Sequence, residues 1–277
     1  MLEIKGLYSG YGGDDIIQDV SFSAKPGEVF CVLGPNGCGK TTLLRSIAGI
    51  LRYRGNVRID RREVSSIPRR ELAKKIALMG QSSEIYFPYT VYDTVVMGRY
   101  AYSPGFLKDL SEEDRGITAA ALEKLELADI KDRLINELSG GQLQRVFLAR
   151  TLVQNPSIIL LDEPTNHLDL KHQVELLRYL AKWAKENNKT VIGALHDLNL
   201  VHHFGDSAAL MNKGKLVAWG RPETVLDGEI LREIYGMDIR QFMLESLEGW
   251  RQSGAADVAE VLPDAGSRRR SAGGKQP

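Results

Sequence analysis

Short apolar runs alternate with stretches of helical spacing along most of the chain. Apolar runs bounded by glycine, proline or aspartate predict strands at residues 2–7, 16–22, 29–33, 55–60, 76–79, 158–161, 190–195, 208–211 and 214–218. Apolar positions three and four residues apart predict helices at 42–48, 67–75, 111–127, 143–150, 173–186 and 198–204. Strands that alternate with helices predict an α/β fold, with a mostly parallel sheet covered by helices on both faces.

Two changes in the pattern indicate the domain organisation. Between about residues 82 and 137 helical spacing prevails, which predicts an inserted helical subdomain, and Ser111 with Asp114 offers N-terminal capping for a helix there. From about residue 249 the composition turns to Gly, Ala, Ser and Arg, which predicts a disordered tail over 249–277. Three arginines at 268–270 leave a nucleic-acid arm as the lesser alternative. We therefore expect one folded domain over residues 1–248.

Charge and hydrophobic composition narrow the range of partners. The 277-residue chain is 43% hydrophobic, with 36 Lys and Arg residues against 36 Asp and Glu residues. Balanced charge provides no overall field toward nucleic acid or an anionic membrane surface, so we expect no nucleic-acid partner. No run of 18 apolar residues occurs, and the first residues lack the pattern of a secretory signal. We expect a cytoplasmic protein that reaches a membrane only through other subunits.

Two cysteines occur, Cys31 in a predicted strand and Cys38 in a glycine-rich segment. Their positions suit a disulfide poorly, which favours a reducing setting. Cys38 stands two residues before Lys40 and just before a predicted helix, and both features favour a thiolate. We expect Cys38 to be alkylated readily and to be protected by bound nucleotide.

The most informative motif is GPNGCGKT, which follows the apolar run at residues 29–33. Its spacing, G-x-x-x-x-G-K-[ST], is that of a phosphate-binding loop between a strand and a helix, and an ordinary glycine turn is the alternative. Such a loop directs backbone N–H groups at one point and suits the phosphates of ATP. We expect Lys40 to reach the β- and γ-phosphates and the Thr41 hydroxyl to bind Mg²⁺. The candidate nucleotide-binding residues are Gly34, Pro35, Asn36, Gly37, Cys38, Gly39, Lys40, Thr41 and Thr42.

A second element of the site is the apolar strand at residues 158–161, which ends in Asp162 and Glu163. Acidic residues at the tip of a buried strand belong in a cleft at the carboxyl edge of the sheet. We expect Asp162 to hold Mg²⁺ and Glu163 to orient or deprotonate the water that attacks the γ-phosphate. A pair of acidic residues that only caps a helix is the alternative.

A second glycine-rich helix N-terminus is formed by Ser139, Gly140, Gly141 and Gln142, directly before the helix predicted at 143–150. With Leu138 these residues spell LSGGQ, the signature of the ATP-binding cassette (ABC) family, which the chain resembles over about residues 1–240. The resemblance implies a phosphate-loop NTPase core, an antiparallel β subdomain at the N-terminus and an inserted helical subdomain. It also implies ATP hydrolysis by a head-to-tail homodimer, in which the signature of one subunit closes over the ATP of the other.

Further positions match the family one by one. Tyr11 resembles the aromatic residue that stacks on adenine, although Tyr8 is close enough to compete. Gln81 resembles the glutamine that contacts Mg²⁺ and water and passes the nucleotide state to a transmembrane partner. Asp169 resembles the aspartate that links the two active sites, and His196 resembles the switch histidine at the γ-phosphate.

Three uses of ATP hydrolysis compete: a membrane importer with separate permease subunits, a translation or repair factor, and a stand-alone regulatory ATPase. Residues 165–169, TNHLD, resemble ribosome-associated members of the family, which usually carry two cassettes. Residues 87–99, 196–200, 220–226 and 231–236 resemble cassettes of iron–siderophore, haem or cobalamin importers, which also use a substrate-binding protein. Residues 87–99 suit either a permease docking surface or a small core beneath the helical subdomain. The resemblance therefore favours the metal-chelate importer, at the cytoplasmic face of the membrane.

Overall fold

The computed structural model describes residues 1–80, 88–102, 110–166 and 168–253. The chain divides into two units, Met1–Leu226 and Asp227–Pro277, which are considered separately. Gln81, a predicted site residue, lies outside the described residues, as does the tail from residue 254.

A six-stranded sheet forms the centre of the first unit, in the order β10-β9-β3-β8-β7-β6. Its members are β3 (Val29–Leu33), β6 (Ile76–Met79), β7 (Ile158–Asp162), β8 (Thr190–Ala194), β9 (Ser207–Asn212) and β10 (Lys215–Gly220). All neighbouring pairs are parallel except β9 and β10. Every residue of β3, β7 and β8 is buried, as expected for strands covered on both faces.

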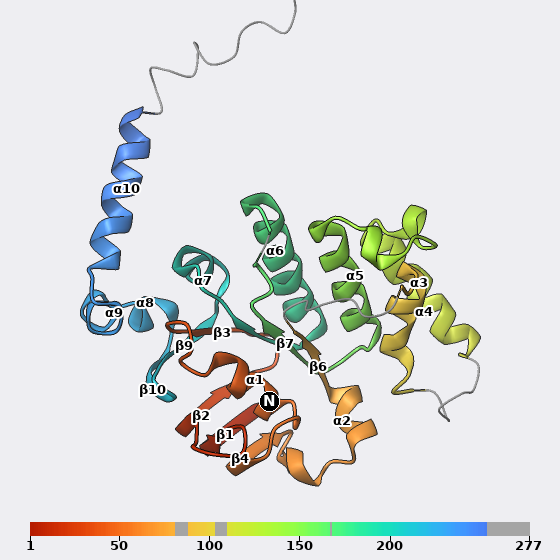
Figure 1. The fold of residues 1–277 in the computed structure, drawn as a ribbon, viewed down its shortest axis with the longest axis horizontal. Helices are drawn as coiled ribbons and strands as arrows, with labels where there is room; N and C mark the ends of the chain where they lie inside the picture. The colour runs from red at the N-terminus through yellow and green to blue at the C-terminus, as the bar shows by residue number, and fades with distance from the viewer. Residues whose placement is uncertain (81–87, 103–109, 167, 254–277) are drawn as a thin grey trace, which may run out of the picture. The chain divides into compact units, whose positions relative to one another are not determined.

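A four-stranded antiparallel sheet, in the order β2-β1-β4-β5, packs beside the first sheet. It consists of β1 (Leu2–Ser9), β2 (Ile17–Ala24), β4 (Tyr53–Ile59) and β5 (Arg62–Glu63). The rings of Phe22 and Phe30 stack between the two sheets, with centroids 4.7 Å apart. Helix α1 (Lys40–Ile47) lies between the sheets and adds Leu43, Leu44 and Ile47 to their common core (Figure 1). The expected antiparallel β subdomain is thus confirmed.

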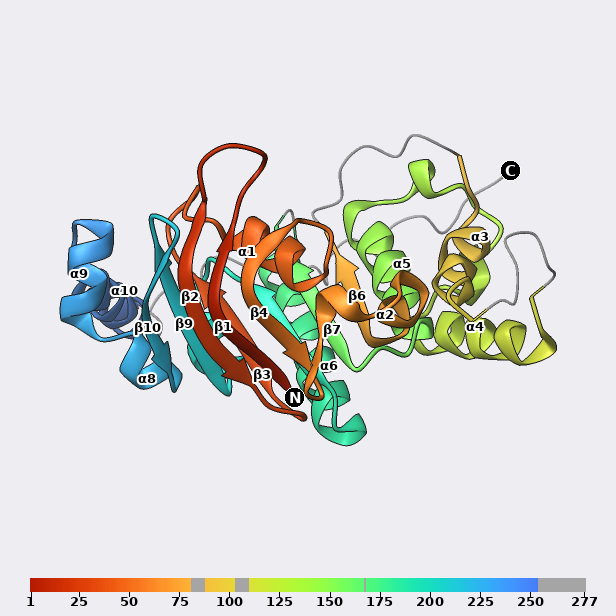
Figure 2. The same cartoon turned by 90° about the horizontal axis from the view of Figure 1, so that it is seen from below.

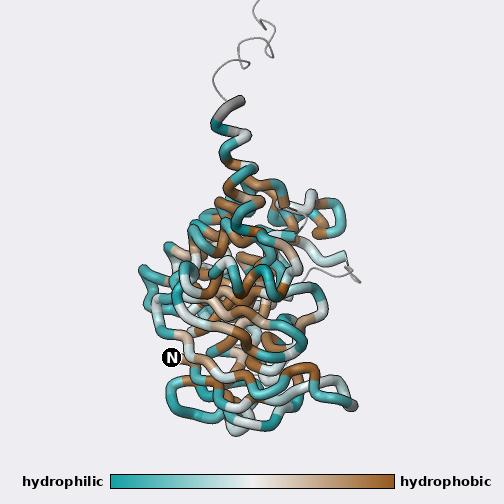
Figure 3. Tube along the Cα trace, turned by 90° about the vertical axis from the view of Figure 1, so that its left-hand side faces the viewer, coloured by the Kyte–Doolittle hydropathy of each residue, from teal (hydrophilic) through white to brown (hydrophobic). Residues whose placement is uncertain are grey.

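Helices cover the opposite face of the six-stranded sheet. They are α5 (Gly140–Val153), α6 (Leu170–Asn187) and α7 (Leu198–Phe204), which lie together above it in Figure 1. The prediction of a mostly parallel sheet covered by helices on both faces therefore holds with one difference. One face is covered by α1 together with the antiparallel sheet, and not by helices alone. Figure 3 shows hydrophobic segments inside this unit and hydrophilic loops outside it.

The remaining short elements connect these layers. They are η1 (Val64–Ser66), α2 (Arg69–Lys75), η3 (Ala128–Ile130), η4 (Ile135–Glu137) and α8 (Pro222–Val225). Helix α8 packs on β9 and β10 at the edge of the six-stranded sheet.

A helical lobe is formed by α3 (Val91–Val96), η2 (Met97–Arg99) and α4 (Glu112–Lys124), which pack on one another and on α5 (Figure 2). Ser111 caps α4 through a reciprocal pair of hydrogen bonds with Asp114, as predicted. Val91, Val95 and Val96 are buried, so most apolar residues of α3 pack inside the lobe, and docking of a permease at residues 87–99 stays a prediction. Whether the lobe is bounded at residues 82 and 137 stays a prediction.

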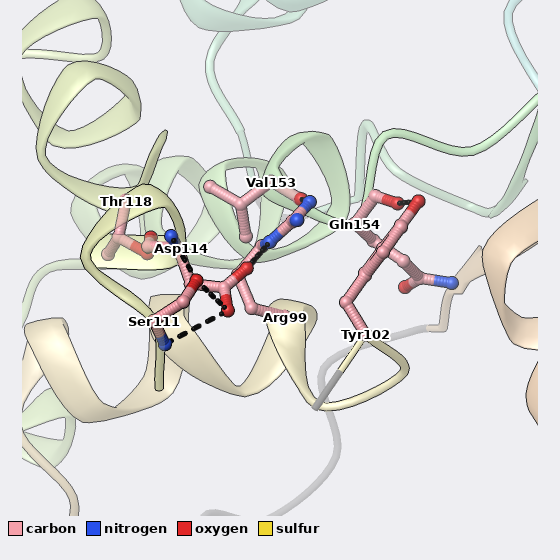
Figure 4. A network of polar contacts seen from close by, with 7 residues as sticks. All are labelled: Arg99, Tyr102, Ser111, Asp114, Thr118, Val153 and Gln154. Atoms are coloured by element: carbon pink, nitrogen blue, oxygen red, sulfur yellow. Dashed lines mark hydrogen bonds and ion pairs between the residues drawn. The ribbon is translucent and has the colours of Figure 1, made fainter. Parts of the chain in front are cut away.

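A buried ion pair joins the helices of this lobe (Figure 4). Arg99 Nε donates to Asp114 Oδ1 at 2.7 Å, and Arg99 Nη1 donates to the Val153 carbonyl, also at 2.7 Å. The Tyr102 ring stacks on the Arg99 guanidinium, 3.9 Å from its carbon, while the Tyr102 hydroxyl donates to the Gln154 carbonyl at 3.0 Å. Burial alone would disfavour the charged carboxylate, but hydrogen bonds from Ser111 and Arg99 outweigh it and hold the pKa of Asp114 below its ordinary value.

The second unit contains α9 (Gly228–Tyr235) and α10 (Ile239–Ser253), neither of which the sequence pattern predicted. Asp227 caps α9 by accepting from two backbone N–H groups, and Gly236 ends the helix in a left-handed conformation. Helix α10 alternates hydrophobic and hydrophilic turns in Figure 3, and it exposes Phe242, Leu244 and Leu247. It runs past residue 249, and the division expected at 248 stays a prediction.

Candidate functional site

The predicted phosphate loop links β3 to α1 and depends on glycines in left-handed backbone conformations. Gly34 has φ 143°, and a Cβ there would lie 2.2 Å from the Met211 carbonyl oxygen. Gly39 has φ 106°, and a Cβ there would lie 2.7 Å from Ile17. Side chains are therefore excluded at both positions, because the loop passes so close to β9 and β2.

The side chain of Lys40 hydrogen bonds back to the first two residues of this loop. Its Nζ donates to the carbonyl oxygens of Gly34 at 2.9 Å and Pro35 at 3.2 Å, and the residue is 4% exposed. Asn36 and Gly37 at the tip of the loop are exposed. The ammonium group is thus held against the loop by two neutral carbonyl oxygens, which phosphate oxygens can replace with stronger, charge-assisted bonds.

The structure contradicts the expectation that Cys38 is a reactive thiolate. Its side chain is buried, only 3% exposed, and this burial raises the pKa of the thiol although Lys40 and a backbone N–H act in the opposite direction. The predicted thiolate character is therefore wrong, because desolvation outweighs the attraction of the lysine. Both cysteines are free thiols, as expected.

The start of α1 and the end of β7 meet through two oxygen-bearing side chains. Thr41 Oγ1 donates to Asp162 Oδ1 at 2.9 Å, across 121 positions of sequence. Burial raises the pKa of the Asp162 carboxyl, with the Glu163 charge adding to the effect and the Thr41 hydrogen bond opposing it. A hydroxyl and a carboxylate side by side form a set of hard oxygen donors, which is the chemistry that Mg²⁺ requires.

Glu163 and His196 meet at the carboxyl ends of β7 and β8, which are neighbouring parallel strands. His196 Nε2 lies 2.7 Å from Glu163 Oε1, and Nε2 carries the proton because a carboxylate only accepts. Asn166 Nδ2 donates to the other carboxylate oxygen, Oε2, at 2.6 Å. Glu163 has φ 53°, an uncommon left-handed conformation for a residue with a side chain. The structure thus brings together two of the residues predicted to carry the chemistry.

Of the two candidate aromatic residues, Tyr11 lies in the loop after β1 and is 54% exposed. Its hydroxyl accepts a hydrogen bond from Arg45 of α1 at 3.1 Å, which ties it to the helix of the phosphate loop. Tyr8 lies within β1, and its ring is 5.4 Å from the Arg54 guanidinium. Tyr11 therefore exposes its ring more fully than Tyr8, which is partly buried, and stacking of Tyr11 on adenine stays a prediction.

The predicted signature residues begin α5. Ser139 caps this helix by a reciprocal pair of hydrogen bonds with Gln142, at 3.3 and 3.0 Å. Ser139 and Gly140 are exposed. In the part of the chain that the structure describes, no hydrogen bond or ion pair joins residues 139–142 to residues 34–42. The two glycine-rich helix ends of one subunit are therefore separate elements.

Asp169 is the N-cap of α6. Its Oδ1 accepts from the His172 backbone N–H at 2.9 Å and lies 2.7 Å from His172 Nδ1. The backbone hydrogen bond is the main reason that the pKa of Asp169 lies below its ordinary value. The side chain is exposed, so it is accessible to a second molecule.

The sequence analysis missed three amides around the turn after β7. Asn166 binds Glu163, Gln144 of α5 donates to the Pro164 carbonyl, and Gln173 of α6 donates to the Thr165 and Leu168 carbonyls at 3.1 and 2.9 Å. No sequence signal distinguishes these amides from ordinary surface residues, since their partners are backbone groups or a carboxylate fixed by the fold.

These features define a phosphate-loop nucleotide-binding protein with a second glycine-rich helix N-terminus. Residues 17–166 match the family described as ABC transporter. The chain belongs to the ABC transporter family, and it is an ATPase that binds ATP.

Two relatives named for import each match most of the chain. It is 36% identical over 240 residues to the petrobactin import ATP-binding protein YclP of Bacillus subtilis, covering 86% of this chain and 94% of that protein. It is 38% identical over 247 residues to the hemin import ATP-binding protein HmuV of Rhodopseudomonas palustris, covering 86% and 88%.

Solved structures agree with these sequence relatives. A metal-chelate type ABC transporter in an inward-facing conformation matches with TM-score 0.75 and 31% identity, over 86% of this chain and 89% of that one. A dimeric ATP-binding cassette bound to ADP and phosphate matches with TM-score 0.70 and 30% identity, over 80% and 99%. Among the described residues, no helix is both long enough and apolar enough to span a membrane.

Proposed function

We propose that this ATPase is the energy-supplying subunit of an importer for a metal chelate, acting on separate permease subunits. The observation that carries the proposal is the pair of contacts at one edge of the sheet, Thr41 with Asp162 and Glu163 with His196. These contacts support a metal site at Thr41 and Asp162 and a catalytic carboxylate at Glu163, close to the phosphate loop. Relatives named for petrobactin, hydroxamate and hemin import support a chelate as the transported molecule.

The residues of the site fit Mg²⁺ and ATP. Thr41 and Asp162 would hold the metal with their oxygens, and Gln81 would complete the set, although its structure lies outside the described residues. Mg²⁺, when bound, neutralises phosphate charge and aligns the phosphates. Lys40 exchanges the carbonyls of Gly34 and Pro35 for phosphate oxygens, while the backbone at residues 34–42 binds the rest of the triphosphate. Tyr11 stacks on the adenine ring.

Glu163 acts on the attacking water in this proposal. The carboxylate accepts a hydrogen bond or a proton from the water, and His196 orients the carboxylate and contacts the γ-phosphate. The proximity of His196 Nε2 to Glu163 Oε1, 2.7 Å, supports a shared role at one point of the site. Removal of either side chain therefore affects turnover more than it affects binding.

A second subunit completes the site. Ser139, Gly140, Gly141 and Gln142 would bind the ATP held by the partner's phosphate loop, because helix N-terminal N–H groups bind anions. The exposure of Ser139 and Asp169, and the dimeric state of a similar solved cassette, support a head-to-tail homodimer closed by ATP. Hydrolysis then reopens the dimer through repulsion between ADP and phosphate, and Gln81 transmits the change to the permease.

In this proposal the ATPase lies at the cytoplasmic face of the membrane. A substrate-binding protein is a further partner, which acts on the permease and not on the ATPase directly. A soluble role in translation or regulation is not favoured, since several relatives are named for import. The test is purification of the tagged full chain from cells after mild chemical cross-linking, with identification of the attached proteins. We expect membrane permease subunits. Recovery with ribosomes and without any membrane protein would contradict the importer function.

A further inference from the structure

We propose that Asn166 is a positioning residue for Glu163, holding one carboxylate oxygen so that the other faces His196. The proposal rests on the proposed catalytic function of Glu163. Asn166 itself does not need to contact ATP.

The carboxylate of Glu163 is held at both ends. Oε2 accepts from Asn166 Nδ2 at 2.6 Å, and Oε1 lies 2.7 Å from His196 Nε2. The terminal torsion of a glutamate is otherwise broad and roughly twofold, so a free carboxylate samples many orientations. Two hydrogen bonds on opposite oxygens fix the plane of the group.

Asn166 can act in this way because its own backbone is fixed. Its N–H donates to the Glu163 carbonyl at 3.2 Å, which closes a turn directly after β7. Gln173 of α6 donates to the carbonyls of Thr165 and Leu168, on either side of Asn166. The Asn166 amide therefore extends from a turn that is held by a neighbouring helix, and not from a free loop.

The same turn is bonded to the helix that carries the signature residues. Gln144 lies two residues after Gln142 on α5, and its side chain donates to the carbonyl of Pro164, the residue after Glu163. The turn that contains Asn166 is thus bonded both to the signature helix α5 and to α6. A change in the position of α5 would reach Glu163 through this turn.

This arrangement predicts a specific kinetic defect. Without the Asn166 amide, the carboxylate retains its charge and its place on the chain but loses one of the hydrogen bonds that fix its orientation. A misplaced catalytic group lowers turnover roughly ten- to a hundredfold, because fewer bound complexes have reactive geometry. ATP binding is unchanged, because the contacts expected to hold the nucleotide come from residues 34–42 and Tyr11.

The test compares Asn166→Ala with Asn187→Ala in the full chain. Asn187 is a matched control, since it is exposed on α6 and its amide donates to the Trp183 carbonyl of the same helix at 2.8 Å. We expect Asn166→Ala to lower kcat about tenfold or more, with KM for ATP within about threefold of wild type. Asn187→Ala should match wild type. An unchanged kcat in Asn166→Ala, or equal losses in both variants, would overturn the proposal.

Two experiments distinguish a positioning role of Asn166 from a general structural role. One is a double-mutant cycle, and the other is an NMR measurement of the Asn166 side-chain amide without ATP. In the Glu163→Gln background, Asn166→Ala should cause no further loss of residual turnover, since the group that it positions is already altered. The side-chain amide resonances of Asn166 should also shift in Glu163→Gln. Additive losses together with unshifted resonances would refute the positioning role. A wild-type protein without ATPase activity would instead refute the proposed function, so the two failures are distinguishable.

Discussion

Glu163 Oε1 lies 2.7 Å from His196 Nε2, and this contact joins the carboxyl ends of β7 and β8. The strands are parallel neighbours, so residues at their ends are close although they stand 33 positions apart in sequence. A carboxylate that accepts from an imidazole N–H has a fixed direction. The pair therefore provides an oriented acceptor at the edge of the sheet where the phosphate loop begins, after β3.

His196→Ala should lower ATP turnover by about a hundredfold, because Glu163 loses an orienting partner and the γ-phosphate loses a contact. ATP binding, measured by displacement of a fluorescent nucleotide, should remain within about threefold of wild type. His202→Ala is the matched control, since this histidine is exposed on α7. Equal kcat in the His196 variant and wild type would contradict the assignment.

Lys40→Ala should weaken ATP binding by roughly ten- to a hundredfold. The reason is that a hydrogen bond to a charged group contributes about 1.5–3 kcal/mol, and each 1.4 kcal/mol is about tenfold in affinity. Isothermal titration calorimetry measures the effect directly. Lys171→Ala, which removes an exposed lysine on α6, should bind ATP as wild type does. Undiminished affinity in the Lys40 variant would mean that residues 34–41 are not the triphosphate site.

Asp114→Asn should destabilise the protein by about 3 kcal/mol, because it leaves the buried Arg99 guanidinium without its charged partner. The pKa of Asp114 is lowered in the folded state, so its contribution is complete above the ordinary Asp pKa of about 4 and is lost as the pH falls through the folded value. Urea unfolding should therefore show a difference from wild type at pH 6 that shrinks toward pH 3. Asp132→Asn, at an exposed position, serves as the control. A difference that grows with acid would contradict the assignment.

Cys38 should react slowly with maleimide even without nucleotide, because it is buried and the pKa of its thiol is raised. An exposed reference cysteine, Ser246→Cys on α10, should react at least roughly tenfold faster at pH 7. The rate of maleimide labelling at Cys38 should increase steadily as the pH rises to 9, because the fraction of thiolate still increases over that range. Rapid labelling of Cys38 at pH 7 would show that the loop opens far more than this structure indicates.

The core strands could be predicted from the sequence because their signal is local. Residues 29–33 and 76–79 are continuous apolar runs, and β3 and β6 have those bounds. Helices α9 and α10 were not predicted, although the apolar residues of 230–235 have helical spacing. Both helices are short of buried positions, since only Leu231 of α9 is fully buried and α10 exposes Phe242, Leu244 and Leu247.

In the candidate site, too, local sequence motifs could be predicted, whereas contacts between distant parts of the chain could not. The glycines and Lys40 could be predicted because backbone chemistry requires those residue types at that spacing. The Thr41–Asp162 contact spans 121 positions, and the bond from Gln144 to the turn after β7 depends on how α5 packs. The state of Cys38 depends on burial competing with charge, and only the folded structure decides that competition.

The most direct test of the account is ATP turnover and self-association of Glu163→Gln, measured together with wild type by phosphate release and by light scattering. We expect Glu163→Gln to bind ATP, to hydrolyse it at least roughly a hundredfold more slowly, and to accumulate as a dimer with ATP. Turnover at the wild-type rate by a variant that stays monomeric with ATP would contradict both the catalytic role of Glu163 and the closed dimer.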